Sequence, residues 1–267
     1  MFNKNYKKKI RLKAKIKKLI INYLNIYTGE GFFPEYPFLK NLPKNPIIKL
    51  DDINNEFGKN QNDYTIFKSA EILNNLVSIM KDYDFTDKKV IEIGPGVANL
   101  SRIIKSKFIS SKFVFIDLQS SLIYSILNLI KRFPNSMYIL PNEINNQNQI
   151  IDNELDFVFL TNKQLNLVPD NYFDIGFNTM SFQEMHFDAI SEYFAFLRRV
   201  LKKENLFYCL NAVEKLMKYN NLNQYIRFQE YPWSKNDHDY YFSLSRIQFG
   251  MTTKPFYEKI TKLKVNL

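Results

Sequence analysis

Residues 89–99 read KVIEIGPGVAN, an apolar, β-branched run that leads directly into two closely spaced glycines. A run of this kind is typical of a buried strand, and the turn at Gly94 and Gly96 then opens a helix. Glycine has no Cβ, so both positions allow a sharp turn and the close approach of a ligand to the backbone. The stretch therefore predicts the first βα unit of an α/β sheet, with a ligand site at its carboxyl end.

Segments of strand and helix character alternate after this unit. Apolar, strand-like runs occur at 112–116, 137–140, 156–160, 173–177 and 206–210. Helices are expected at 63–81, 100–107, 120–132 and 188–203. Short apolar strands separated by helices predict an α/β fold with a doubly wound, mainly parallel sheet that is buried on both faces.

Three further segments complete the layout. Residues 51–62 and 142–149 are polar and turn-like, and we expect loops there. The pattern loosens beyond Asn211, where aromatic residues occur without a clear period. Residues 256–265 alternate again, which predicts an antiparallel C-terminal edge strand.

The net charge of +10 comes from one end of the chain. Residues 1–18 carry nine basic side chains, and no acidic residue precedes Glu30. The rest has 28 basic residues, nine fewer than the 37 of the whole chain, against 27 acidic ones. The body is thus nearly neutral, which argues against a nucleic-acid partner. The tail is expected to be either a solvated basic arm or a segment that rests on an anionic membrane surface or a polyanion.

Cysteine and histidine are scarce in this chain. The single cysteine, Cys209, excludes a disulfide framework and a Cys-based zinc site, and two histidines exclude a multi-His metal cluster. No apolar run has the length of a bilayer span, and no signal peptide pattern occurs. These features favour a soluble protein of the cytoplasm.

Two acidic residues flank the glycine turn. Glu92 lies two residues before Gly94, and Asp117, with Leu118 after it, ends the second strand, where a carboxylate can accept hydrogen bonds from both ribose hydroxyls. A nicotinamide dinucleotide site requires a third glycine, because its pyrophosphate lies against the helix N-terminus. Asn99 occupies that position, and Glu92 would repel a pyrophosphate. The pattern favours S-adenosylmethionine, whose amino-acid end is cationic.

Four pieces of the sequence resemble the sugar O-methyltransferase family, a branch of the class I S-adenosylmethionine-dependent enzymes. They are VIEIGPGVANLSRII (90–104), FVFIDLQSSL (113–122), FDIGFNTMSFQEM (173–185) and NLFYCLN (205–211). The resemblance covers residues 60–212 and implies the class I, Rossmann-like fold, the methyl donor as cofactor and a carbohydrate hydroxyl as acceptor. The N-terminal tail and the C-terminal quarter match more weakly.

This resemblance implies a division of the chain. Residues 1–62 are expected to form a basic tail and a loop-rich, partly helical extension. Residues 63–267 are expected to form the methyltransferase domain, with a cofactor-binding core at 88–212 and acceptor-side elements at 213–267. Enzymes that methylate exocyclic amino groups of nucleic-acid bases usually carry an Asn/Asp-Pro-Pro-aromatic motif after the strand that corresponds to 173–177. This chain has no Pro-Pro pair, which again argues against a nucleic-acid substrate.

Two residues that follow the strand at 173–177 are candidates for the catalytic base. A sugar hydroxyl is a poor nucleophile, and a positioned base accelerates its attack by roughly 10²–10⁴-fold. His186 and Glu184 follow that strand, near where the transferred methyl group is expected. The alternative is that Glu184 caps the following helix and that His186 is only exposed.

Other polar or aromatic residues at strand ends and loops complete the predicted site. Those assigned to the cofactor are Thr161, Asn162 and Asn178, and those assigned to the acceptor are Gln183, Trp233, Asp237 and His238. Trp233 would stack on a sugar ring. The segment 237–239 has two alternative interpretations, a solvated acidic turn or a divalent metal site that clamps a sugar diol.

The sequence thus predicts a methyltransferase for a sugar hydroxyl in surface polysaccharide biosynthesis. Its partners would be a sugar or glycan precursor and, through the tail, the inner membrane surface. Two alternatives stay open, an O-methyltransferase for another small molecule and a non-catalytic, methyltransferase-like binding module.

Overall fold

A computed structural model of the protein describes residues 46–57, 64–81, 83–219, 222–245 and 255–265. All of them belong to one compact unit. The basic tail at 1–18 lies outside the described residues, so its predicted contact with a membrane or polyanion stays a prediction. No helix of the described part of the chain is long and apolar enough to cross a bilayer.

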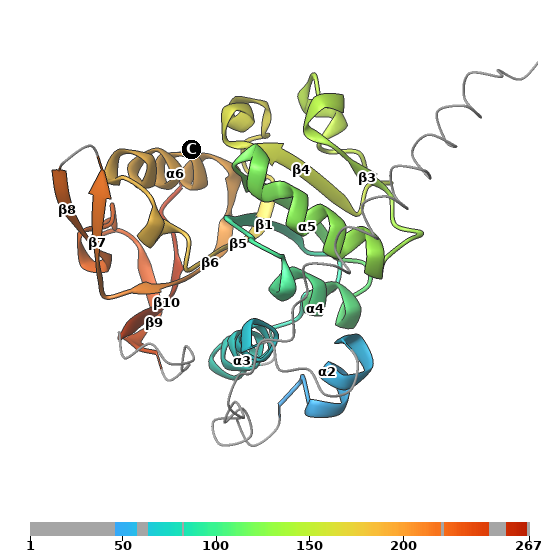
Figure 1. Cartoon of the computed structure of the whole chain (residues 1–267), viewed down its shortest axis with the longest axis horizontal. Helices are drawn as coiled ribbons and strands as arrows, with labels where there is room; N and C mark the ends of the chain where they lie inside the picture. Colours follow the sequence, from blue (N-terminus) through green and yellow to red (C-terminus); the bar gives the residue numbers. More distant parts are fainter. Residues whose placement is uncertain (1–45, 58–63, 82, 220–221, 246–254, 266–267) are drawn as a thin grey trace, which may run out of the picture. The chain divides into compact units, whose positions relative to one another are not determined.

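An eight-stranded sheet runs through the unit in the order β3–β4–β2–β1–β5–β6–β10–β9 (Figure 1). Its strands are β1 (Lys89–Ile93), β2 (Lys112–Asp117), β3 (Tyr138–Ile139), β4 (Phe157–Thr161), β5 (Phe173–Thr179), β6 (Leu201–Ala212), β9 (His238–Leu244) and β10 (Phe256–Lys262). The first six pair in parallel, and β10 is antiparallel to both of its neighbours. This confirms the predicted doubly wound, mainly parallel, Rossmann-like sheet.

Helices cover both faces of the sheet because its strands are apolar on both sides. One core holds Val90 of β1 with side chains of α3 (Tyr64–Ile79), α4 (Asn99–Lys107) and α5 (Gln119–Arg132). The other core holds Ile91 of β1 with side chains of α6 (Phe187–Val200). Successive strand residues therefore point to opposite cores, as the pleat requires. The strand order reverses at β1, which makes the carboxyl end of β1 the switch point where such sheets bind ligands.

Two segments predicted as loops have regular structure. Residues 51–62 include α2 (Leu50–Phe57), whose Ile53 is buried in the same core as α3. Glu56 ties this helix to α4 and α5, because it accepts hydrogen bonds from Arg102 and Arg132 at 2.7 Å each. Residues 142–149 contain parts of two 3₁₀ turns, Pro141–Glu143 and Gln147–Gln149, which carry no apolar period.

The C-terminal strand β10 is antiparallel, as predicted, but its position in the sheet differs from the prediction. Strand β10 does not form an edge; it pairs with β6 on one side and with β9 on the other. Its burial explains this position, because Ile260 and Thr261 are fully covered. Strands β7 (Glu214–Tyr219) and β8 (Leu222–Arg227) form a separate antiparallel hairpin, seen at the left of Figure 1. The predicted domain boundary after residue 62 stays a prediction.

Candidate functional site

A cavity of about 690 Å³ opens at the carboxyl ends of β1, β2 and β5. This volume lies within the range of roughly 300–1,000 Å³ that is usual for small-molecule sites. Most of the predicted cofactor residues and both candidate bases line it, namely Glu92, Gly94, Gly96, Asp117, Leu118, Asn162, Glu184 and His186. Parallel strands bring these separate segments to one edge of the sheet, as the switch-point rule predicts.

The two glycines of the turn have different reasons to be glycine. Both have positive φ, +66° at Gly94 and +58° at Gly96. A Cβ on Gly94 would overlap with the side chain of Ser181, whereas a Cβ on Gly96 would meet no atom within 4 Å. Gly94 is therefore required by the packing of the β5 turn against β1. Gly96 leaves its space to the cavity, where a ligand can approach the backbone.

Glu92 is the buried acid of the cavity, with an exposed fraction of only 2%. The hydroxyl of Ser101 donates a hydrogen bond to its carboxylate. Burial raises the pKa of Glu92 to about 7, while the Ser101 hydrogen bond and the positive charge of Lys68 act in the opposite direction. A cationic ligand would stabilise the ionised carboxylate, so this position favours positive charge.

Asp117 ends β2 beside the glycine turn. Its Oδ1 accepts a hydrogen bond from the backbone amide of Leu118 at 2.7 Å. Burial raises its pKa, and the backbone amides of Leu118 and Gly96 partly counter that effect. The charge of Asp117 also reaches Tyr193 of α6, whose pKa is raised to about 12, first by burial and then by Asp117. Tyr193 lines the same cavity and was missed by the sequence analysis.

The two candidate bases differ in what holds them. Glu184 ends the 3₁₀ turn Phe182–Glu184 and forms an ion pair with Lys215 of β7. His186 occupies the N-cap of α6, so the interpretation of Glu184 as the helix cap is wrong. The Nδ1 atom of His186 lies 3.4 Å from the backbone nitrogen of Asp188 and 3.2 Å from its Oδ2. The imidazole is just over half exposed, at 55% of its side chain.

Asn178 was assigned to the cofactor, but the structure gives it a different role. It is fully buried and does not line the cavity. Its Nδ2 donates to the carbonyl of Ile93 at 3.1 Å and to Ser181, while its Oδ1 accepts from Asn211 at 2.8 Å. The side chain therefore ties the end of β5 to β1 and β6.

Two more predicted residues serve their own turns. The Oγ1 of Thr161 donates to Gln164 at 3.0 Å and starts the 3₁₀ segment Asn162–Leu167, so only Asn162 reaches the cavity. The Oε1 of Gln183 accepts a hydrogen bond from the backbone of Ala212 at 2.6 Å, which anchors the turn after β5 to β6. The predicted acceptor contact of Gln183 is therefore not supported by its placement, because the residue is buried outside the lining.

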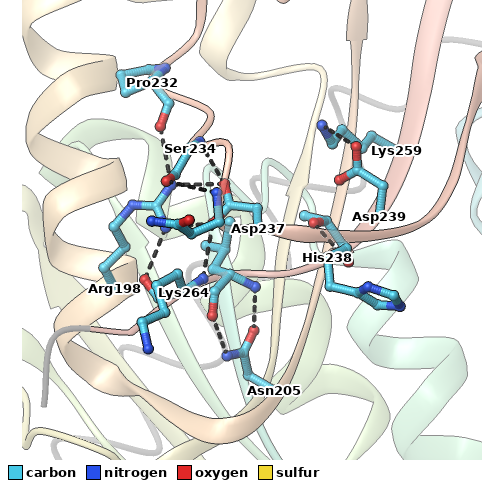
Figure 2. Close-up of polar contacts among 12 residues, drawn as sticks. Arg198, Asn205, Pro232, Ser234, Asp237, His238, Asp239, Lys259 and Lys264 are labelled. Atoms are coloured by element: carbon cyan, nitrogen blue, oxygen red, sulfur yellow. Dashed lines mark hydrogen bonds and ion pairs between the residues drawn. The ribbon is translucent and has the colours of Figure 1, made fainter.

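Hydrogen bonds connect the predicted acceptor loop at 233–238 to α6 and to the segment after β10 (Figure 2). Asp237 accepts hydrogen bonds from both Nη atoms of Arg198, at 2.6 and 2.8 Å, and from the backbone amides of Ser234 and Lys264, at 2.8 Å each. Its side chain is 1% exposed. Although burial acts against it, the hydrogen bonds from Arg198 and the amides hold the pKa of Asp237 below its ordinary value.

The neighbours of Asp237 do not reach the cavity either. Trp233 packs edge-on against Phe194, with ring centroids 4.8 Å apart, and its Nε1 donates to a backbone carbonyl at 2.9 Å. His238 lies exposed at the start of β9. The internal contacts of Trp233 and Asp237 do not support their predicted acceptor roles, and the role of His238 stays a prediction. The carboxylate of Asp237 is bound by Arg198, so it is not free to act as the ligand that the metal alternative requires. Among the described residues, no group of three or more acidic, His or Cys side chains suits a metal ion.

Helix α3 supplies cavity residues that the sequence analysis did not select. Thr65, Lys68 and Ser69 all line the cavity. Lys68 Nζ lies 3.3 Å from the sulfur of Met180, another lining residue, whose φ of +62° marks the sharp turn after β5. The sequence shows α3 to be amphipathic, but only the tertiary arrangement reveals which of its polar residues face the glycine turn.

No family model matches the sequence, and no curated protein matches it. Among solved structures, the chain is similar to the pyocyanin biosynthetic protein PhzM, with 11% identity, a TM-score of 0.43 and coverage of 77% of this chain and 60% of PhzM. It is also similar to the PH0226 protein from Pyrococcus horikoshii, with 14% identity, a TM-score of 0.48 and coverage of 77% of this chain and 93% of that protein. Its similarity to the mitomycin 7-O-methyltransferase MmcR has 8% identity, a TM-score of 0.42 and coverage of 73% of this chain and 56% of MmcR. At such identities the likeness says nothing about substrate.

Proposed function

We propose that this protein is an S-adenosylmethionine-dependent O-methyltransferase. The observation that carries the proposal is one cavity that joins the glycine turn to two carboxylates from adjacent strand ends, Glu92 and Asp117. Asp117 would accept hydrogen bonds from the ribose hydroxyls, and Glu92 would pair with the cationic end of the donor. Gly96 would let the donor lie directly on the backbone, because no side chain fills that space.

A dinucleotide fits the same cavity less well. Glu92 is an acid near the place where a pyrophosphate would lie in such sites. Asn99, at the third glycine position, donates from Nδ2 to Thr65 Oγ1 at 2.8 Å and so holds α3 against the turn. In a dinucleotide site, a glycine at this position lets the helix pack closely against the strand. Here the Asn99 side chain fills the position and contacts α3 instead.

His186 is the residue that we assign as the base for the acceptor hydroxyl. The bound donor supplies an electrophilic methyl group, and the protein must orient the acceptor and take its proton. The carboxylate of Glu184 is engaged in the ion pair with Lys215, so His186 is the better placed of the two candidates. His186 sits at the cavity on a fixed helix cap, and a neutral imidazole accepts a proton near neutral pH.

The acceptor that we propose is a sugar hydroxyl of a surface polysaccharide or its precursor. This part of the proposal is supported by the resemblance in residues 173–185 and by the presence of two candidate bases at the cavity. We propose a cytoplasmic protein whose basic tail contacts the anionic inner membrane surface. A mass-spectrometric comparison of cell-surface glycans with and without the protein tests this, because loss of a methyl group from one sugar is expected.

Calorimetric titration tests the donor. S-adenosylmethionine and S-adenosylhomocysteine should bind the purified protein, and NADH should not. In a transfer assay with the true acceptor, His186→Gln should lower turnover by about 100-fold with donor affinity preserved. Glu184→Gln is the matched variant on the same turn and should retain most of the turnover. Wild-type turnover in His186→Gln would exclude it as the base, and binding of NADH alone would contradict the proposed cofactor.

A further inference from the structure

A second cavity, of about 450 Å³, is lined by residues from the amino end of β6, the start of β9 and the carboxyl end of β10. Its charged and aromatic lining residues are Lys203, His238, Tyr240, Lys262 and Lys264. Strand β6 is parallel to β5, whose carboxyl end borders the cavity with the glycine turn. The second cavity therefore lies at the opposite edge of the sheet, and a ligand there would not overlap with the methyl donor.

Positive charge predominates in this basic cavity. Three of its lining residues are lysines, and none is an aspartate or a glutamate. The carboxylate of Glu204, whose side chain is 75% exposed, accepts a hydrogen bond from Lys262 at 2.6 Å. That hydrogen bond and the charges of Lys262 and Lys203 lower the pKa of Glu204. Two lysines from different strands thus already act on one anionic group, and a cavity lined by one sign of charge attracts ligands of the other sign.

The backbone that carries these lysines is held in place by buried side chains (Figure 2). Asn205 accepts a hydrogen bond from the amide of Leu263 and donates one to its carbonyl, at 3.0 Å each. The amide of Lys264 donates to Asp237 at 2.8 Å, and its carbonyl accepts from Arg198 at 2.9 Å. The walls of the basic cavity are therefore fixed, and a ligand has to order only the lysine side chains.

An exposed aromatic pair completes the basic cavity. The rings of His238 and Tyr240 meet edge to face, with centroids 4.9 Å apart, and Tyr240 is 43% exposed. Both residues point to the same side of β9, because side chains two positions apart share a face of a strand. An aromatic surface beside ammonium groups suits a ligand that joins an anionic group to an organic body.

We propose that the basic cavity binds a phosphate ester, with the phosphate between Lys203, Lys262 and Lys264 and the organic part against Tyr240. The phosphate would take the place of Glu204 at Lys262, and an ion pair this exposed costs little to open. The ester can be a soluble molecule or a lipid headgroup, since both carry the same chemistry. The inference is independent of the proposed function, because the two cavities lie at opposite edges of the sheet.

The test uses full-length protein and two probes, uridine diphosphate in calorimetric titrations and phosphatidylcholine vesicles with and without phosphatidic acid in sedimentation. Lys203→Gln combined with Lys264→Gln should weaken binding of the phosphate-bearing probe by about 10- to 100-fold, the range for lost hydrogen bonds between charged groups. Lys131→Gln combined with Lys163→Gln removes two exposed lysines outside the cavity and should bind as wild type does.

Glu204→Gln should change the affinity in the opposite direction. It frees Lys262 from its ion pair, so binding should become about two- to fivefold tighter, a gain that a general structural defect would not produce. Saturating S-adenosylhomocysteine should leave the affinity for uridine diphosphate unchanged. Uridine, which has no phosphate, should bind more weakly than uridine diphosphate.

An effect of the lysine variant on uridine diphosphate identifies a soluble ester as the ligand, and an effect on the vesicles alone identifies a lipid headgroup. The inference is overturned if wild type binds neither probe, or if the Lys203 and Lys264 variant loses no more affinity than the control variant. Uridine that binds wild type as tightly as uridine diphosphate would also overturn it. If the double variant does not fold, Lys264→Gln alone, beside Lys131→Gln, gives the same comparison.

Discussion

Asp117 and Asp237 were both predicted to bind ligands, and the structure gives them opposite surroundings. Asp237 connects α6 to the segment after β10, because its carboxylate accepts hydrogen bonds from both Nη atoms of Arg198 and from two backbone amides. Asp117 lies at the cavity and accepts hydrogen bonds from the backbone amides of Leu118 and Gly96. No lysine or arginine in the described ranges forms an ion pair with Asp117.

The two carboxyl groups differ in proton affinity for the same reason. Burial acts on both of them. The donors around Asp237 more than offset that effect and lower its pKa, whereas the amides at Asp117 leave its pKa raised. A carboxylate whose hydrogen bonds and counter-charge come from the protein supports the fold. A carboxylate that lies at a cavity without a cationic partner is suited to a ligand.

The largest expected effect is on the structural carboxylate. Asp237→Ala should destabilise the fold by about 3 kcal/mol, because it leaves the Arg198 guanidinium, whose side chain is only 12% exposed, without its carboxylate partner. Since the folded pKa of Asp237 is lowered, its contribution is present above the unfolded pKa and is lost as pH falls through the folded pKa. Urea unfolding measures the change. Asp239→Ala, a more exposed aspartate paired with Lys259, is the matched control and should cost less than about 1 kcal/mol.

A change of comparable size but opposite sign in the free energy of unfolding is expected for Glu92, which lies at the cavity. The pKa of Glu92 is raised to about 7, so the buried carboxyl opposes folding increasingly as pH rises from its unfolded pKa through 7. Glu92→Gln should remove this penalty and gain up to about 3 kcal/mol over wild type between pH 5 and pH 8. The same variant should bind S-adenosylhomocysteine more weakly. An unchanged difference in unfolding free energy at the two pH values would contradict a buried, titrating Glu92.

A smaller change in stability is expected at the glycine that faces the cavity. Gly96→Ala should cost about 1–2 kcal/mol, because alanine is strained at a φ of +58°, and should also block the approach of the donor. Gly176→Ala is the matched control, because its Cβ would lie 3.3 Å from side chains of Leu197 and Phe207. That variant should lose stability through overpacking and keep its affinity for S-adenosylhomocysteine. Equal affinities in both variants would remove Gly96 from the ligand site.

The sequence predicts the parts of the site that depend on local patterns. β-branched runs locate the central strands, and Gly94 and Gly96 mark the turn because few other residues tolerate positive φ. Glu92 and Asp117 follow from their fixed spacing to that turn. These four residues and the succession of parallel strands along the chain therefore needed no tertiary information.

The other assignments depend on contacts between distant segments. Asn178 and Asn162 both end strands, but Asn211, 33 residues away, holds the former inside the core. Asp237 was indistinguishable from a ligand residue until Arg198, 39 residues away, was found on its carboxylate. The interior position of β10 and the orientation of Lys68 have the same origin, since both are set by elements remote in the sequence.

One titration tests the account most directly: calorimetry of S-adenosylhomocysteine with Asp117→Ala, beside urea unfolding of the same variant. We expect the affinity to fall by about 100-fold, because the ribose hydroxyls lose a charged acceptor, while the free energy of unfolding changes by less than about 1 kcal/mol. Wild-type affinity in a folded Asp117→Ala protein would contradict the claim that this cavity binds the methyl donor.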